Sequence, residues 1–121
     1  MKFRAELYRR LVAPKNSRFS NKVVWTPSLA KAVTFEPNLR LPVHNWFFYK
    51  QGFSRDLVAW ILKNYKVPRD WLVFDPFVGV GTTLLACREL GYSAIGIDIL
   101  PLAVFVSKVK CEPNYEIQAT E

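Results

Sequence analysis

Residues 74–84, with the sequence FDPFVGVGTTL, constrain the fold more than any other stretch of this chain. An apolar run rich in β-forming residues lies just before it, at 70–74, and an apolar run of helical period closed by Gly91 follows it. We therefore expect a strand, a tight glycine turn and the start of a helix in direct succession. The first N–H groups of a helix lack intrahelical partners and carry partial positive charge, so this arrangement is typical of a site for an anion or a nucleotide.

Two well-known glycine motifs do not fit the turn. A P-loop requires a lysine before its Ser or Thr, and no lysine precedes Thr82. A dinucleotide fingerprint that begins at Gly79 and Gly81 requires a third glycine where this chain has Leu84. The two glycines present still allow a ligand to approach the backbone closely, because neither has a Cβ. What remains is the pattern D-P-F-x-G-x-G-T-T, and a turn that serves an unrelated ligand or none is the alternative.

A second strand is predicted at residues 93–99, where apolar residues alternate up to an acid at Asp98. An acidic residue about 20 positions beyond a glycine turn, at the end of the next strand, is the usual acceptor for ribose hydroxyls. The two features together predict a ligand that contains a nucleoside.

The stretches DPFVGVGTT (75–83) and GIDILPLA (96–103) resemble motifs I and II of the amino-group DNA methyltransferases. These enzymes transfer a methyl group from S-adenosylmethionine to N6 of adenine or N4 of cytosine. The resemblance implies S-adenosylmethionine as cofactor, with its ribose on Asp98 and its adenine near Ile99. The residues that it implies around the methionine half are Asp75, Pro76, Phe77, Gly79, Gly81, Thr82 and Thr83.

A second resemblance lies upstream, in GFSRDL (52–57), which is similar to motif X of the same family. The residues themselves predict an amphipathic helix that begins after Ser54 as N-cap, with Phe53 as a hydrophobic staple. Motif X of the family contacts the cofactor carboxylate, which implies contacts from Phe53 and Ser54 and adds Lys50 as a further candidate. Ser54 stands where the family more often has proline.

Basic residues are concentrated in the first part of the chain. Residues 1–55 contain eleven Lys and Arg against two acids, whereas the remainder has six against eight, which together give the net charge of +7. Such asymmetry is typical of a segment that contacts nucleic acid, although a solvated basic tail has the same composition. We expect double-stranded DNA as the partner, with backbone contacts from Arg9, Arg10, Lys15, Arg18 and Lys22.

Several other classes of protein are not indicated. No run approaches the roughly 20 apolar residues that cross a bilayer, and the first residues lack a signal-peptide core, so we expect a soluble, cytoplasmic protein without membrane contact. Cys87 and Cys111 form no C-x-x-C pair, and Cys87 on the predicted helix is interpreted as a small buried hydrophobe. His44 is the single histidine, and no metal site is predicted.

The catalytic motif of the family is an Asp, Asn or Ser followed by Pro-Pro and an aromatic residue, and no Pro-Pro pair occurs in this chain. We therefore expect no catalytic residue here. The resemblance covers about residues 43–110, which are predicted to form the part that binds S-adenosylmethionine. Residues 1–42 are interpreted as a basic segment that contacts nucleic acid or a partner, and 111–121 as a polar tail.

The expected fold is α/β, namely a partial Rossmann-like sheet of the class I methyltransferases. Two strong strands, at 71–75 and 93–97, make a sheet too small to be stable alone and leave an open strand edge, so a partner chain is needed. Our hypothesis is the cofactor-binding subunit of a split, heterodimeric DNA methyltransferase of a restriction–modification system, with the catalytic motif on the other chain. The alternatives are a standalone module that binds S-adenosylmethionine or nucleic acid, and part of an RNA amino-methyltransferase.

Overall fold

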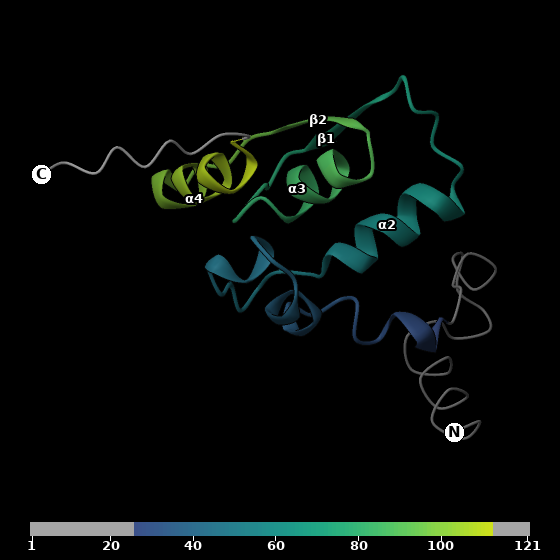
Figure 1. The fold of residues 1–121 in the computed structure, drawn as a ribbon, viewed down its shortest axis with the longest axis horizontal. Helices are drawn as coiled ribbons and strands as arrows, with labels where there is room; N and C mark the ends of the chain where they lie inside the picture. Colours follow the sequence, from purple (N-terminus) through teal and green to yellow (C-terminus); the bar gives the residue numbers. More distant parts are fainter. Residues whose placement is uncertain (1–25, 113–121) are drawn as a thin grey trace, which may run out of the picture.

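The structure, a computed structural model, describes residues 26–112. Its elements in chain order are η2 (Pro27–Leu29), η3 (Glu36–Arg40), η4 (His44–Trp46), α2 (Arg55–Asn64), β1 (Leu72–Asp75), α3 (Thr82–Glu89), β2 (Ser93–Gly96) and α4 (Pro101–Cys111) (Figure 1). The α/β class is confirmed, as is the succession of strand, glycine turn and helix predicted around residues 74–84. Among the described residues, no helix has the length and apolar character needed to cross a bilayer.

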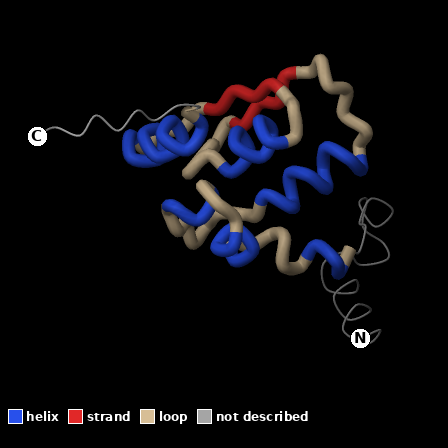
Figure 2. Tube along the Cα trace, viewed as in Figure 1, coloured by secondary structure: helices blue, strands red, loops and turns tan. Residues whose placement is uncertain are grey.

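The two strands pair in parallel, with Leu72 opposite Ser93 and Asp75 opposite Gly96. A parallel pair requires a crossover connection, which α3 provides. Figure 2 shows the strands along one side of the molecule, with α3 next to them and α2 beyond α3. The carboxyl ends of both strands therefore meet at one edge of the sheet, beside the start of α3.

The main core lies between α2, α3 and the sheet. Cys87 is fully buried in it, as predicted, and burial raises the pKa of its thiol, which keeps the sulfur neutral. Phe53 packs against the same cluster as Val58, the arrangement expected of a hydrophobic staple on α2. The buried members of this core are Val58, Leu62, Ala86 and Cys87, with Val73 and Ala94 of the strands packed against them.

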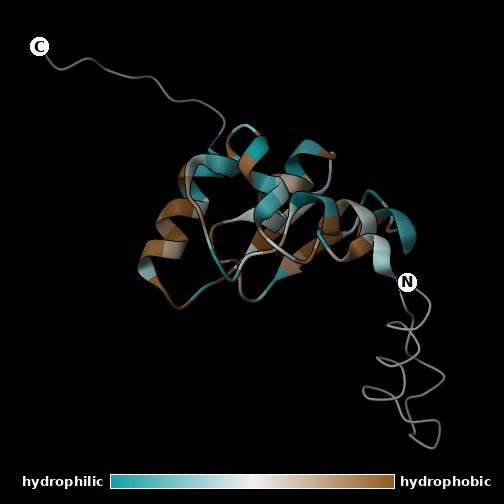
Figure 3. Cartoon of the chain, turned by 90° about the horizontal axis from the view of Figure 1, so that it is seen from below, coloured by the Kyte–Doolittle hydropathy of each residue, from teal (hydrophilic) through white to brown (hydrophobic). Residues whose placement is uncertain are grey.

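The other face of the sheet is bare in the part of the chain that the structure describes. Leu72 and Phe74 of β1 are 62% and 56% exposed, and Ile95 of β2 is 50% exposed. The helix α4 also exposes apolar side chains, among them Phe105, and is coloured largely hydrophobic in Figure 3. Exposed apolar areas of this extent are unusual on the surface of a monomeric protein. They agree with the expectation that the sheet needs further cover.

A polar network fixes the chain before α2. His44, 1% exposed, places Nε2 3.2 Å from Oε1 of Glu89, whose other oxygen accepts from Nε of Arg55 at 3.0 Å. Burial lowers the pKa of His44, while the Glu89 carboxylate acts in the opposite direction. Lys110 of α4 is also buried, and its Nζ donates to the carbonyl of His44 at 3.0 Å. Residues near 44–47 are thus tied directly to α3 and α4, and through Glu89 to Arg55 of α2.

Gly81 sets the distance between α3 and α4. It is the N-cap of α3 and has φ +82°, and a Cβ placed on it would lie 2.9 Å from both Cα and Cβ of Ser107. Those atoms belong to the helix body and cannot rotate away. Gly91 also has positive φ, +74°, but its Cβ would meet only the end of the flexible Arg69 side chain.

This difference predicts unequal effects of two otherwise similar substitutions. Gly91→Ala costs about 1–2 kcal/mol, the ordinary penalty for a side chain in the left-handed region. Gly81→Ala carries that penalty and also displaces α4, so it lowers the free energy of unfolding by at least about 1 kcal/mol more. Urea unfolding of the complete protein measures both, and equal losses would contradict the proposed contact between Gly81 and Ser107.

Candidate functional site

The candidate site is built on the loop that joins β1 to α3. Gly79 and Gly81 both have positive φ there, +50° and +82°, which fulfils the expectation of a glycine-dependent turn. Thr82 and Thr83, the first residues of α3, are buried beneath the loop. The start of an eight-residue helix therefore faces the edge of the sheet at which the strands end.

Asp75 orders this loop from the end of β1. One carboxylate oxygen accepts from the N–H of Phe77 at 3.0 Å, and the other accepts from the hydroxyl of Thr83. The strand end is thereby joined to the loop and to the first turn of α3. Each carboxylate oxygen accepts more than one hydrogen bond, so these contacts leave acceptor capacity toward a ligand.

Asp98 ties the same loop to the end of the second strand. Its Oδ2 accepts from the N–H of Gly79 at 2.9 Å, and its Oδ1 accepts from the N–H of Leu100 at 2.9 Å. The N–H groups of Leu100 and Gly79 hold the pKa of the Asp98 carboxyl below its usual value, so the group is ionised at neutral pH. The structure thus brings together Gly79 and Asp98, which were predicted from separate motifs.

Two apolar side chains close to this pair in sequence, Phe77 and Ile99, are largely uncovered by the other described residues. Phe77 is 84% exposed and Ile99 is 93% exposed, the two highest values among the exposed large hydrophobic residues of the described chain. Exposed apolar groups beside an ionised acceptor suit a ligand that is part polar and part planar.

The residues predicted from motif X lie less directly at the loop. Ser54 occupies the N-cap position of α2, as expected, but its hydroxyl does not cap the helix and donates instead to the carbonyl of Ala32 at 3.0 Å. The cap comes from Asn38, whose Oδ1 accepts from the N–H of Arg55 at 2.8 Å. Ser54 is fully buried, whereas Lys50 is exposed.

The contact between this segment and the glycine loop is made by Tyr49, which the sequence reasoning did not select. A Cβ on Gly79 would lie 3.4 Å from Cε1 of the Tyr49 ring. Tyr49 also packs against the second core cluster, formed by Phe35, Val80 and Val106. The only sequence signal was an aromatic residue four positions before Phe53, which is too common to single out.

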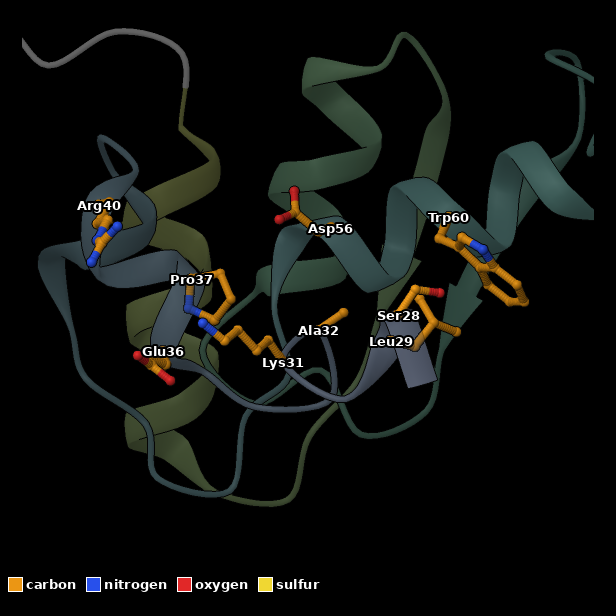
Figure 4. Close-up of a pocket in the computed structure, with 9 residues that line it drawn as sticks. All are labelled: Ser28, Leu29, Lys31, Ala32, Glu36, Pro37, Arg40, Asp56 and Trp60. Atoms are coloured by element: carbon orange, nitrogen blue, oxygen red, sulfur yellow. The ribbon is translucent and has the colours of Figure 1, made fainter. Parts of the chain in front are cut away.

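A groove of about 550 Å³ lies elsewhere, between α2 and the 3-10 helices. In the close-up, Trp60 and Leu29 lie at one end and Arg40 and Glu36 at the other (Figure 4). Its cations and acids balance, and it contains none of the predicted cofactor residues, so it does not compete as the nucleotide site. The lining residues are Ser28, Leu29, Lys31, Ala32, Glu36, Pro37, Arg40, Asp56 and Trp60.

Two other predictions concern different parts of the chain. The basic residues expected on DNA, which are Arg9, Arg10, Lys15, Arg18 and Lys22, lie outside the described residues. Within residues 26–112, no three His, Cys, Asp or Glu side chains gather in a way that would hold a metal ion.

Comparison with known proteins gives the family. A family model described as DNA methylase, of the N6 and N4 type, matches residues 6–107. The chain is 41% identical over 84 residues to the type II methyltransferase M.BsoBI of Geobacillus stearothermophilus, an alignment that covers 69% of this chain and 16% of that protein. It is 38% identical over 94 residues to the type II methyltransferase M.AvaI of Nostoc sp., covering 77% of this chain and 20% of the relative.

A third relative, the type II methyltransferase M.MjaII of Methanocaldococcus jannaschii, is 34% identical over 113 residues, which cover 92% of this chain and 21% of that protein. No solved structure matches significantly. The chain spans about one fifth or less of the length of these curated relatives. The match over most of the chain nevertheless agrees with the resemblance seen in the glycine turn and the acidic strand end, and this chain belongs to the N6 and N4 DNA methylase family.

Proposed function

We propose that this chain is the cofactor-binding part of a DNA amino-methyltransferase, which methylates N6 of adenine or N4 of cytosine. The observation that carries the proposal is the meeting of Asp75, the Gly79 turn and the ionised Asp98 at one edge of a parallel sheet. Ligands of open α/β sheets bind at the carboxyl ends of the strands. The family supports S-adenosylmethionine as the ligand, and we propose that the two strands belong to a Rossmann-like sheet.

The residues present fit this cofactor. The glycine turn and the start of α3 suit the methionine carboxylate, because helix N-termini attract anions and Gly79 offers no side chain in the way. Asp98 retains lone pairs for the ribose hydroxyls, and Ile99 offers an apolar surface to the adenine. Phe53, Ser54 and Lys50 are proposed to support the methionine half. When bound, the cofactor supplies the methyl group on its sulfonium.

We further propose that the catalytic Pro-Pro-aromatic motif lies on a partner subunit. The amino nitrogen of adenine or cytosine is a poor nucleophile because its lone pair conjugates with the ring, so the reaction needs acceptors aimed at that amino group. No Pro-Pro pair is present to build them. The partner would cover the bare face at Leu72, Phe74 and Ile95 through an obligate interface of roughly 2,000 Å² or more.

The DNA would be contacted in part by the basic residues before position 26. Seven of the chain's 17 Lys and Arg residues lie there, against one acid, which gives this segment a charge of +6. Such a segment neutralises phosphates without reading sequence. We place target recognition on the partner for that reason.

The role of Asp98 is testable by cofactor titration. Asp98→Ala removes the acceptor for the ribose and frees the N–H of Gly79, so S-adenosylmethionine binds more weakly by about 1–3 kcal/mol. Asp56→Ala is the matched control, since Asp56 is an exposed acid of α2. Calorimetry on the complete enzyme measures both, and equal affinity of the two variants would remove Asp98 from the site.

The proposal that cofactor binding and catalysis lie on separate chains is testable by a methyl-transfer assay. A partner is expected from a neighbouring reading frame that encodes Asp, Asn or Ser followed by Pro-Pro-aromatic and lacks the glycine motif. Transfer of tritiated methyl groups is measured with each chain alone and with the two mixed, on duplex DNA and on RNA. We expect activity only from the mixture and only on DNA.

Activity of this chain by itself would contradict the split arrangement, because the reactive acceptors would then lie among these 121 residues. Transfer to RNA without transfer to DNA would contradict the proposed substrate. The mixture containing Asp98→Ala serves as the control for cofactor dependence.

A further inference from the structure

The ring of Tyr49 lies against the glycine loop at Gly79. Its ring carbon Cε1 is 3.4 Å from the place that a Cβ of Gly79 would occupy, which is ordinary van der Waals contact. Gly79 is also the residue whose N–H is held by Asp98. Tyr49 is therefore next to the turn that joins the two acidic strand ends, although it belongs to a segment far away in sequence.

The phenol group of Tyr49 is not used by the protein in the described part of the chain. Within residues 26–112, its hydroxyl has no hydrogen-bond partner, whereas the hydroxyl of Tyr92 donates to the carbonyl of Val67 at 3.1 Å. Tyr49 is only partly buried, with its ring against the core cluster that contains Phe35 and Val80. The ring is thus packed in part, and its hydroxyl keeps its hydrogen-bonding capacity among the described residues.

The backbone around Tyr49 is held firmly, so the ring is kept in position. Its carbonyl accepts from the N–H of Gly52 at 2.9 Å, which closes a turn. Just before it, the buried Nζ of Lys110 donates to the carbonyl of His44 and lies 3.5 Å from that of Phe47. A side chain whose supporting backbone is fixed loses little freedom when it binds a ligand.

We propose that Tyr49 lines the methionine half of the cofactor site and donates its phenolic O–H to the methionine carboxylate of S-adenosylmethionine. This inference rests on the proposed function. It assigns a residue that lies outside both DPFVGVGTT (75–83) and GIDILPLA (96–103). The carboxylate is the anionic group of that half, and a phenol is a suitable donor to an anion. Asp75 and Asp98, the two acids of the loop, cannot serve the carboxylate because they are acceptors.

The test uses Tyr49→Phe, which removes one oxygen and keeps the packed ring. Two ligands are titrated by calorimetry into the complete enzyme, namely S-adenosylmethionine and 5′-methylthioadenosine, which retains the nucleoside and lacks the amino-acid end. We expect Tyr49→Phe to weaken S-adenosylmethionine binding about tenfold, as for a lost hydrogen bond to a charged group, and to leave methylthioadenosine binding within about twofold. Tyr92→Phe is the matched control and leaves the ratio of the two affinities unchanged.

The outcomes separate this inference from the one on which it rests. Unchanged binding of S-adenosylmethionine to Tyr49→Phe would overturn the role of the hydroxyl. An equal loss for both ligands would overturn it too, because a purely structural effect does not depend on the amino-acid end. Failure of the unaltered enzyme to bind S-adenosylmethionine would overturn the proposed function itself.

Discussion

The structure at the sheet edge depends on the Asp98 carboxylate. It receives the N–H of Gly79 from the loop and the N–H of Leu100 from the start of α4, so one side chain joins the two βα connections. The backbone reinforces the joint, because the N–H of Val78 donates to the carbonyl of Ile97 at 2.9 Å. The glycine turn is therefore preformed. A preformed turn matters for binding, since a ligand then meets ordered donors and acceptors without first having to organise them.

This joint also explains the glycines that are not in the turn. A Cβ on Gly96 would lie 2.5 Å from Cγ2 of Val78, so only glycine at the end of β2 lets the loop fold down onto the strand. Gly81 plays the corresponding role toward α4, where it leaves room for Ser107. The opposite face of the sheet is bare among residues 26–112, at Leu72 and Ile95. This bare face supports the proposal that a partner covers the sheet.

The central part of this arrangement was predictable because it is local. Glycine spacing, the Asp at a strand end and the apolar periods around them depend on neighbours in sequence, and β1, α3 and β2 follow from them. The prediction of a cap on α2 was right in position and wrong in chemistry, because Ser54 occupies the N-cap position but the side chain that accepts from the N–H of Arg55 is Asn38, 17 residues earlier. Tyr49 was missed for the same reason, since its contact with Gly79 spans 30 residues and leaves no periodic signal.

The central claim is that the cofactor binds at the glycine loop, and the most direct test is to map the residues that it contacts. S-adenosylmethionine with a tritiated methyl group is crosslinked to the complete enzyme by ultraviolet light, with excess unlabelled cofactor as competitor, and the labelled peptides are sequenced. The account predicts displaceable label in the peptides that contain the glycine loop at 75–83 or the Tyr49 segment at 44–52. Displaceable label confined to the groove residues around Arg40 and Trp60, or none on this chain, would contradict it.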